Sequence, residues 1–134
     1  GNSTNSGTTT FIKFRESDGG DVGELRTDSG TIQLNDASDE RLKNNIRDTE
    51  IKGLETLNKL KVRDFEWKKS GETIIGGFVA QEVQEHYNQA VGLPMSDGLL
   101  GVSQNRFIPL MLKAIQELSQ KNEALEKRIE ELEK

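Results

Sequence analysis

The chain is 134 residues long, enough for one modest domain, and its formal net charge is −5. This acidic balance disfavours a surface that binds nucleic acid, and the absence of cysteine and of any long apolar run excludes disulfides, thiolate metal sites and a membrane-spanning helix. Because only 32% of the residues are hydrophobic and 5% are aromatic, we expect an extended molecule or one that completes its core by oligomerising.

Residues 1–37 have the composition of a β-rich segment. The first ten are Gly, Asn, Ser and Thr and are predicted to form a flexible lead-in. Three short alternating stretches follow, at 11–14, 22–25 and 31–34, and the Asp/Gly clusters between them predict turns. Strands this short cannot bury a face alone, so they suit either a fibrous β-structure in which several chains share one core or a loose three-stranded meander.

Residues 38–106 alternate between helical and strand patterns, which predicts a small mixed domain. The period changes at 48–60, where Asp48 or Thr49 is expected to cap a helix that Gly53 weakens by about 1 kcal/mol relative to alanine. Three further elements are predicted in chain order: a hairpin over 62–67 and 73–75, a short helix over 80–87, and a loop with at most one strand pair over 91–103.

A heptad repeat over 107–134 predicts a parallel coiled coil. Lys121 with Glu126 and Arg128 with Glu133 match in sign across parallel chains, and isoleucine at a, leucine at d and an asparagine at a favour a dimer. The alternative is one amphipathic helix lying on a domain. The a positions are Ile108, Ile115, Asn122 and Ile129, and the d positions are Met111, Leu118, Leu125 and Leu132.

One short segment offers catalytic chemistry. Lys43 follows Ser38 by five residues, at the point where the composition of the chain changes. A serine beside a lysine can hydrolyse a bond without histidine, but the lysine accepts a proton only when neutral, which requires burial or a neighbouring cation such as Arg41. The spacing alone is weak evidence, because Ser38-Asp39 is also an ordinary helix N-cap sequence.

No other combination of residues predicts a site. His86, the only histidine, is expected on the surface of a short helix. No spacing of His, Asp and Glu resembles a metal site, and Gly76-Gly77 lacks the lysine of a phosphate-binding loop. We therefore expect no metal and no cofactor.

Four parts of the chain carry a family resemblance. They are Ser-Asp-Glu-Arg-Leu-Lys-Asn-Asn-Ile at 38–46, Phe-Glu-Trp at 65–67, Gly-Phe-Val-Ala-Gln-Glu-Val at 77–83, and the heptads. Together they resemble the C-terminal intramolecular chaperone auto-processing domain of phage tailspikes, tail fibres, neck appendages and endosialidases. A related domain occurs in a eukaryotic membrane-anchored transcription factor. The resemblance covers about residues 38–134.

The resemblance implies a homotrimer whose folding client is its own upstream stalk, in a triple β-helix or a similar fibre. It also implies autoproteolysis at the Ala37–Ser38 bond, with Ser38 as nucleophile, Lys43 as general base, and Asp39 and Arg41 positioning the pair. Such a protein is a single-turnover serine peptidase without an external substrate. Some members have been linked to a bound nucleotide; this chain has no phosphate motif, and a nucleotide remains the alternative to no cofactor.

The resulting expectation is an α+β protein in three parts: the end of a stalk over 1–37, a chaperone domain over 38–106 and a trimeric coiled coil over 107–134. The family further implies action in the host cytoplasm during virion assembly, with no membrane or nucleic-acid partner, and release of the chaperone from the mature virion protein. The alternatives are a trimerisation module of the same fold that does not cleave, and an unrelated coiled-coil adaptor.

Overall fold

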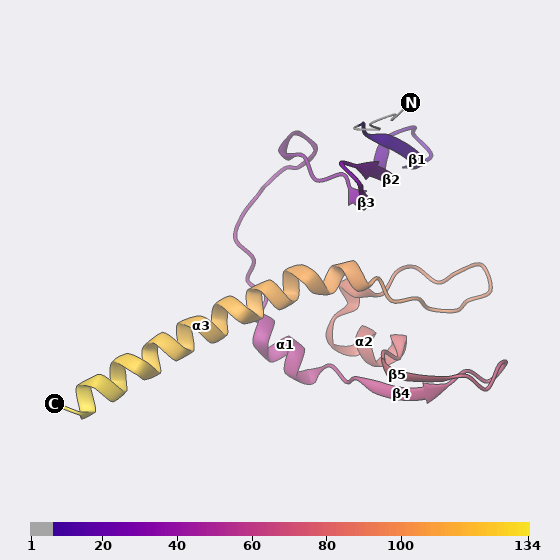
Figure 1. Ribbon diagram of the computed structural model, residues 1–134. Helices are drawn as coiled ribbons and strands as arrows, with labels where there is room; N and C mark the ends of the chain where they lie inside the picture. Colours follow the sequence, from indigo (N-terminus) through magenta and orange to yellow (C-terminus); the bar gives the residue numbers. More distant parts are fainter. Residues whose placement is uncertain (1–6) are drawn as a thin grey trace. The chain divides into compact units, whose positions relative to one another are not determined.

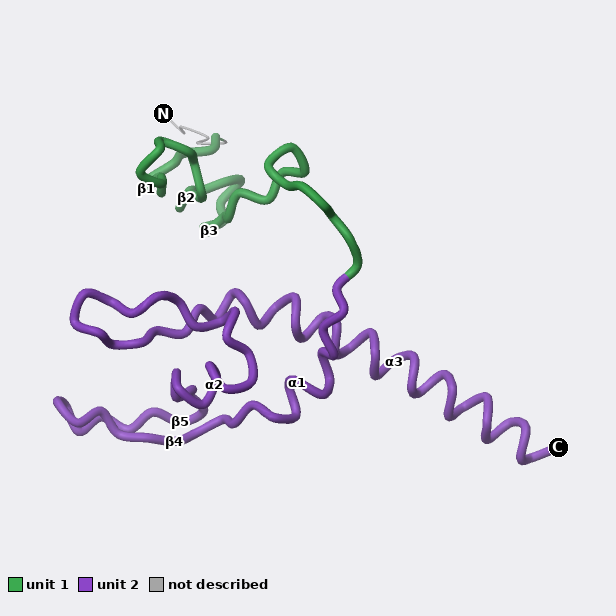
Figure 2. Tube along the Cα trace, turned by 180° about the vertical axis from the view of Figure 1, so that it is seen from behind, with its two compact units in different colours: residues 1–48 green, residues 49–134 purple. Residues whose placement is uncertain are grey.

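The computed structural model describes residues 7–134; residues 1–6, which belong to the predicted lead-in, lie outside the described part. The fold is α+β, with small sheets and one long helix (Figure 1). The chain divides into two compact units, one ending at Asp48 and the other beginning at Thr49 (Figure 2). Residues 38–48 therefore belong to the same unit as the strands that precede them.

The first unit contains a three-stranded antiparallel meander. Its strands are β1 (Thr9–Arg15), β2 (Asp21–Asp28) and β3 (Thr31–Asp36), in the order β1-β2-β3. A two-residue turn joins β2 to β3, with φ of 48° at Ser29 and 82° at Gly30. Positive φ at both turn residues is the conformation that matches the twist of a tight hairpin. The three predicted strands are confirmed.

The meander has no core of its own. No residue between 7 and 48 is buried, and Phe11, Ile32 and Leu34 keep 63%, 78% and 59% of their surface exposed. This agrees with the expectation that strands so short cannot bury a face alone.

The second unit consists of a hairpin and three α-helices (Figure 1). The predicted hairpin, short helix and long helix are confirmed, and an isolated bridge between Val91 and Val102 is the strand pair in the loop. The elements are α1 (Gly53–Lys59), β4 (Arg63–Glu66), β5 (Thr73–Gly77), α2 (Ala80–His86) and α3 (Phe107–Leu132).

The core of this unit is small, as the low apolar content predicts. Phe78 and Phe107 stack with ring centroids 4.8 Å apart, and the hydroxyl of Tyr87 donates a hydrogen bond of 3.0 Å to the carbonyl of Arg106. These contacts join α2 to the start of α3. The buried residues of the cluster are Val83, Tyr87, Ala90, Phe107 and Leu110.

The predicted start of the first helix is wrong. α1 begins at Gly53, while the Thr49 hydroxyl accepts a local hydrogen bond from the N–H of Ile51. The carboxylate of Glu117, on α3, instead accepts hydrogen bonds from the N–H groups of Gly53 and Leu54, at 3.0 and 2.8 Å. A side chain distant in sequence thus satisfies the free donors of the first turn.

Replacing Glu117 by glutamine is expected to destabilise the second unit at neutral pH but not in acid. The hydrogen bonds from Leu54 and Gly53 lower the pKa of the Glu117 carboxyl. A carboxyl group whose pKa is lowered by folding stabilises the folded protein at pH values above its ordinary pKa, about 4.3. This stabilisation is lost as the pH falls through the pKa of the folded state. Denaturant midpoints should therefore differ at pH 7 and converge below about pH 4, whereas Glu130→Gln should have little effect. A difference that is independent of pH would contradict this assignment.

Gly53 has a packing role, because α1 approaches α3 closely at this residue. A Cβ at Gly53 would lie 2.6 Å from the backbone nitrogen of Ala114. We expect Gly53→Ala to lower the free energy of unfolding by about 1–2 kcal/mol, since overpacking outweighs the better helix propensity of alanine. Gly92→Ala is the matched control, because no atom lies within 4 Å of its Cβ position. Equal denaturant midpoints for the two variants would show that the helices can separate without cost.

α3 has two apolar faces with different surroundings. Phe107, Leu110 and Ala114 are buried against the second unit, and the later turns of the helix project beyond α1, α2 and the hairpin (Figures 1 and 2). No helix in the described part of the chain combines the length and the apolarity needed to cross a membrane. The apolar residues at the a and d positions, here called the a/d stripe, are all exposed: Ile108, Met111, Ile115, Leu118, Leu125, Ile129 and Leu132.

Candidate functional site

A single helical turn reverses the chain after Ser38. Residues Glu40–Leu42 form a 3-10 helix, η1, and the Asp39 carboxylate caps it by accepting a hydrogen bond of 2.8 Å from the N–H of Arg41. The turn closes with a hydrogen bond of 3.0 Å from the N–H of Lys43 to the carbonyl of Glu40. Asp39 is therefore the N-cap residue that the sequence suggested here, and the cap directs Lys43 back toward Ser38.

The turn brings the side chains of Ser38 and Lys43 into direct contact. The Lys43 ammonium nitrogen, Nζ, lies 2.6 Å from Ser38 Oγ and 2.8 Å from the Ser38 carbonyl oxygen. The second contact fixes the amine in place beside the hydroxyl. A general base must lie within about 2.6–3.2 Å of the group whose proton it accepts. The geometry therefore meets the distance requirement of a serine–lysine pair.

Asp39 and Arg41 form an ion pair within the same turn. Arg41 Nε and Nη2 donate hydrogen bonds of 2.9 Å to the two carboxylate oxygens of Asp39. The side chain of Arg41 and then its backbone N–H lower the pKa of the Asp39 carboxyl, and Asp39 raises the pKa of Arg41. The positive charge of Arg41 is thus partly offset by Asp39, which weakens the repulsion expected between Arg41 and Lys43.

The residue before the predicted scissile bond is held by the sheet. The N–H of Ala37 donates a hydrogen bond of 2.8 Å to the carbonyl of Val22, which continues the β2–β3 ladder beyond Asp36. Within residues 7–134, no hydrogen bond is made to the Ala37 carbonyl oxygen. Sequence analysis missed Val22, because a backbone carbonyl leaves no side-chain signal.

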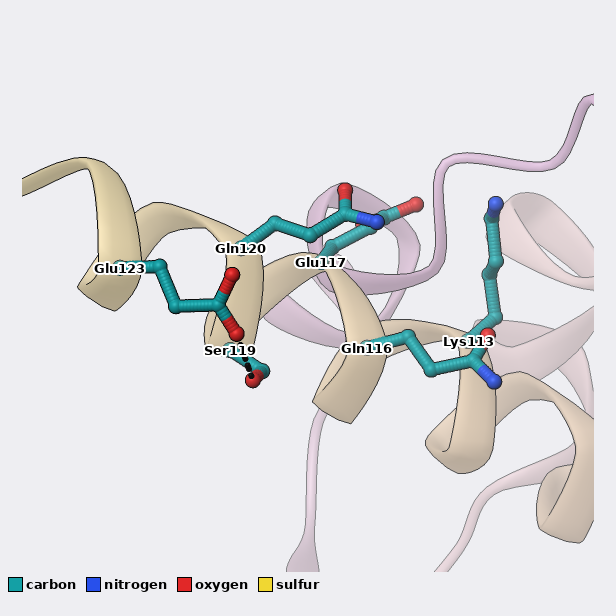
Figure 3. Close-up of a pocket in the computed structure, with 6 residues that line it drawn as sticks. All are labelled: Lys113, Gln116, Glu117, Ser119, Gln120 and Glu123. Atoms are coloured by element: carbon teal, nitrogen blue, oxygen red, sulfur yellow. Dashed lines mark hydrogen bonds between the residues drawn. The ribbon is translucent and has the colours of Figure 1, made fainter.

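Other polar groupings do not form a second site. An open hollow on α3 is lined by polar side chains from successive turns of the helix (Figure 3). Its Glu117 is engaged with α1, and Ser119 donates a hydrogen bond to Glu123. Residues 7–134 contain no group of three His, Asp, Glu or Cys side chains placed to hold a metal ion. The residues lining the hollow are Lys113, Gln116, Glu117, Ser119, Gln120 and Glu123.

Comparison with known proteins matches the part of the chain that begins at this turn. Residues 38–92 match the model of a peptidase family described as Chaperone of endosialidase. No curated protein matches the chain. The matched segment includes the Ser38 turn, α1, the hairpin and α2, and it ends before α3. The resemblance inferred from the sequence is confirmed over residues 38–92, where the match to the endosialidase chaperone family supports an intramolecular chaperone domain.

Proposed function

We propose that this protein trimerises, aligns an upstream β-fibre as its folding client, and then releases itself by cleaving its own Ala37–Ser38 bond. The observation that carries the proposal is the 2.6 Å contact between Lys43 Nζ and Ser38 Oγ, at the first residue of the family match. A peptidase family supplies the reaction class, and the contact supplies a nucleophile with a base. The reaction occurs once per chain and has no external substrate.

The chemistry needs only atoms of this turn and one water. Neutral Lys43 takes the proton of Ser38 Oγ, and Oγ attacks the carbonyl carbon of Ala37. The Ala37–Ser38 C–N bond then breaks, and the released Ser38 nitrogen takes the proton from Lys43, which leaves an ester between Ala37 and Ser38 Oγ. Water hydrolyses this ester, which gives a carboxylate and a proton at Ala37 and restores the Ser38 hydroxyl, so that the second fragment begins with the free amine of Ser38.

Trimerisation is supported by the surface that a single chain leaves uncovered. The a/d stripe of α3 keeps between 44% and 78% of each side chain exposed, although the same helix buries another face in its own unit. Such a stripe is the surface through which parallel helices associate in a coiled coil. The exposed apolar residues of β1 and β3 would be covered in the same way, in a fibre core shared by three chains.

A fibre of short strands benefits from such a chaperone for physical reasons. Weakly patterned strands can slip in register, and distant segments cost entropy to bring together before any contact forms. A trimerising domain raises the effective concentration of the three segments. Cleavage in the host cytoplasm during virion assembly would remove the scaffold and leave a fibre that is stable kinetically.

A second candidate is a trimerisation module that does not cleave. Ser38 and Lys43 are both exposed, so the structure does not show the burial that a lysine base requires. This candidate predicts the same oligomer and the same client, but an intact chain.

Intact-mass spectrometry of the wild-type chain, expressed with more of its native stalk, tests the proposal beside the Ser38→Ala variant. We expect a fragment that begins at Ser38 in the wild type only, because alanine has no nucleophile. Uncut chains in both proteins, after long incubation of a confirmed trimer, would leave the non-cleaving module as the function. Cleavage in both would assign the nucleophile to another residue.

A further inference from the structure

The last step of the β2–β3 ladder requires glycine. Gly23 pairs with Asp36, and a Cβ at Gly23 would lie 2.5 Å from the backbone carbonyl oxygen of Asn35. This distance is shorter than real Cβ contacts, and the atom it meets is backbone, which cannot move aside as a side chain can. Any other residue at position 23 therefore has to push the end of β3 away from β2.

The end of β3, which a larger residue at position 23 would displace, is followed directly by the predicted scissile bond between Ala37 and Ser38. The next step of the ladder after Gly23 and Asp36 is the 2.8 Å hydrogen bond from the N–H of Ala37 to the carbonyl of Val22. This bond fixes the residue that contributes the acyl group. On the other side of the scissile bond, the Lys43 amine holds the hydroxyl and the carbonyl of Ser38.

We infer that Gly23 is a positioning residue for self-cleavage: it allows β2 and β3 to stay paired up to Ala37, so that the Ala37 carbonyl is presented to Ser38 Oγ. The inference rests on the proposed function. This role makes the rate of cleavage depend on the pairing of β2 with β3. Ala37, which contributes the acyl group, is held by β2, and Ser38, which contributes the nucleophile, is held by the turn that contains η1. Misplacement of reacting atoms by about 1 Å can cost roughly 100-fold in rate.

The test compares Gly23→Ala with two other glycine variants in the full chain with its native stalk. Gly7→Ala is the neutral control, because no atom lies within 4 Å of its Cβ position. Gly30→Ala strains the turn at the opposite end of the same ladder, where φ is +82°. We expect Gly23→Ala to slow cleavage by about 10–100-fold, Gly30→Ala to slow it less, and Gly7→Ala to leave it unchanged.

Amide hydrogen exchange at Ala37, measured in a Ser38→Ala background, gives a readout independent of cleavage. Gly23→Ala should raise the exchange rate of the Ala37 N–H at least as strongly as it slows cleavage. Equal slowing by Gly23→Ala and Gly30→Ala, or a protected Ala37 N–H in Gly23→Ala, would overturn the inference while self-cleavage stands. A wild type that is never cut overturns the proposed function instead, and the exchange measurement still shows whether Gly23 controls Ala37.

Discussion

Replacing Lys43 by glutamine is expected to slow cleavage of the Ala37–Ser38 bond by about 100- to 10,000-fold, the usual contribution of a general base. Lys43 Nζ lies 2.6 Å from Ser38 Oγ, so it is placed to receive the proton that the hydroxyl loses on attack. A glutamine amide can donate a hydrogen bond to the same oxygen but does not accept its proton. The measurement is a time course of intact mass, made once sedimentation equilibrium has given the mass of the proposed trimer.

Lys43→Arg separates the role of a base from the role of a charge. Arginine keeps a cation near Ser38 and can donate to both oxygens that Lys43 contacts, but it stays protonated in proteins. We expect Lys43→Arg to be as slow as Lys43→Gln. Cleavage at the wild-type rate in Lys43→Arg would mean that a positive charge beside Ser38 is sufficient, and it would remove Lys43 as the general base.

Local sequence patterns predicted most of the elements that the structure contains. The alternation of apolar and polar residues between the turn clusters predicted β1, β2 and β3. The two-residue turn Ser29-Gly30 determines which residues of β2 and β3 pair. The five-residue spacing of Ser38 and Lys43 allowed contact but could not show it. Contact depends on the Asp39 cap, and the sequence was equally compatible with a longer helix that would have kept the two side chains apart.

The features that sequence reasoning missed depend on contacts between distant residues or on backbone atoms. The first turn of α1 is capped by Glu117, which lies 64 residues from Gly53. A cap predicted from neighbouring residues alone therefore placed the start of α1 too early. The carbonyl of Val22 has no side-chain signature. On α3, the heptad pattern predicted the exposed stripe, but it could not separate that stripe from the face around Leu110, which its own unit buries.

Leu118→Asp is expected to convert the oligomer into monomers. Leu118 is a central member of the a/d stripe and is 47% exposed in a single chain. Burial of the part of this side chain that is still exposed is worth about 1 kcal/mol per chain, and aspartate at the same position adds the cost of removing a charge from water. Sedimentation equilibrium should give the mass of a trimer for the wild type and of one chain for the variant.

Gln120→Asp is the matched control, because it makes the same charge on the same helix at a position outside the a/d stripe. It should remain trimeric, and both variants should keep the helical and strand content of the folded second unit, whose core does not include Leu118. Because the proposed cleavage follows folding of the associated stalks, Leu118→Asp should lose cleavage and Gln120→Asp should keep it. A Leu118→Asp chain that keeps the wild-type mass would place the interface on another surface, and a wild type that is dimeric would refute the trimeric chaperone.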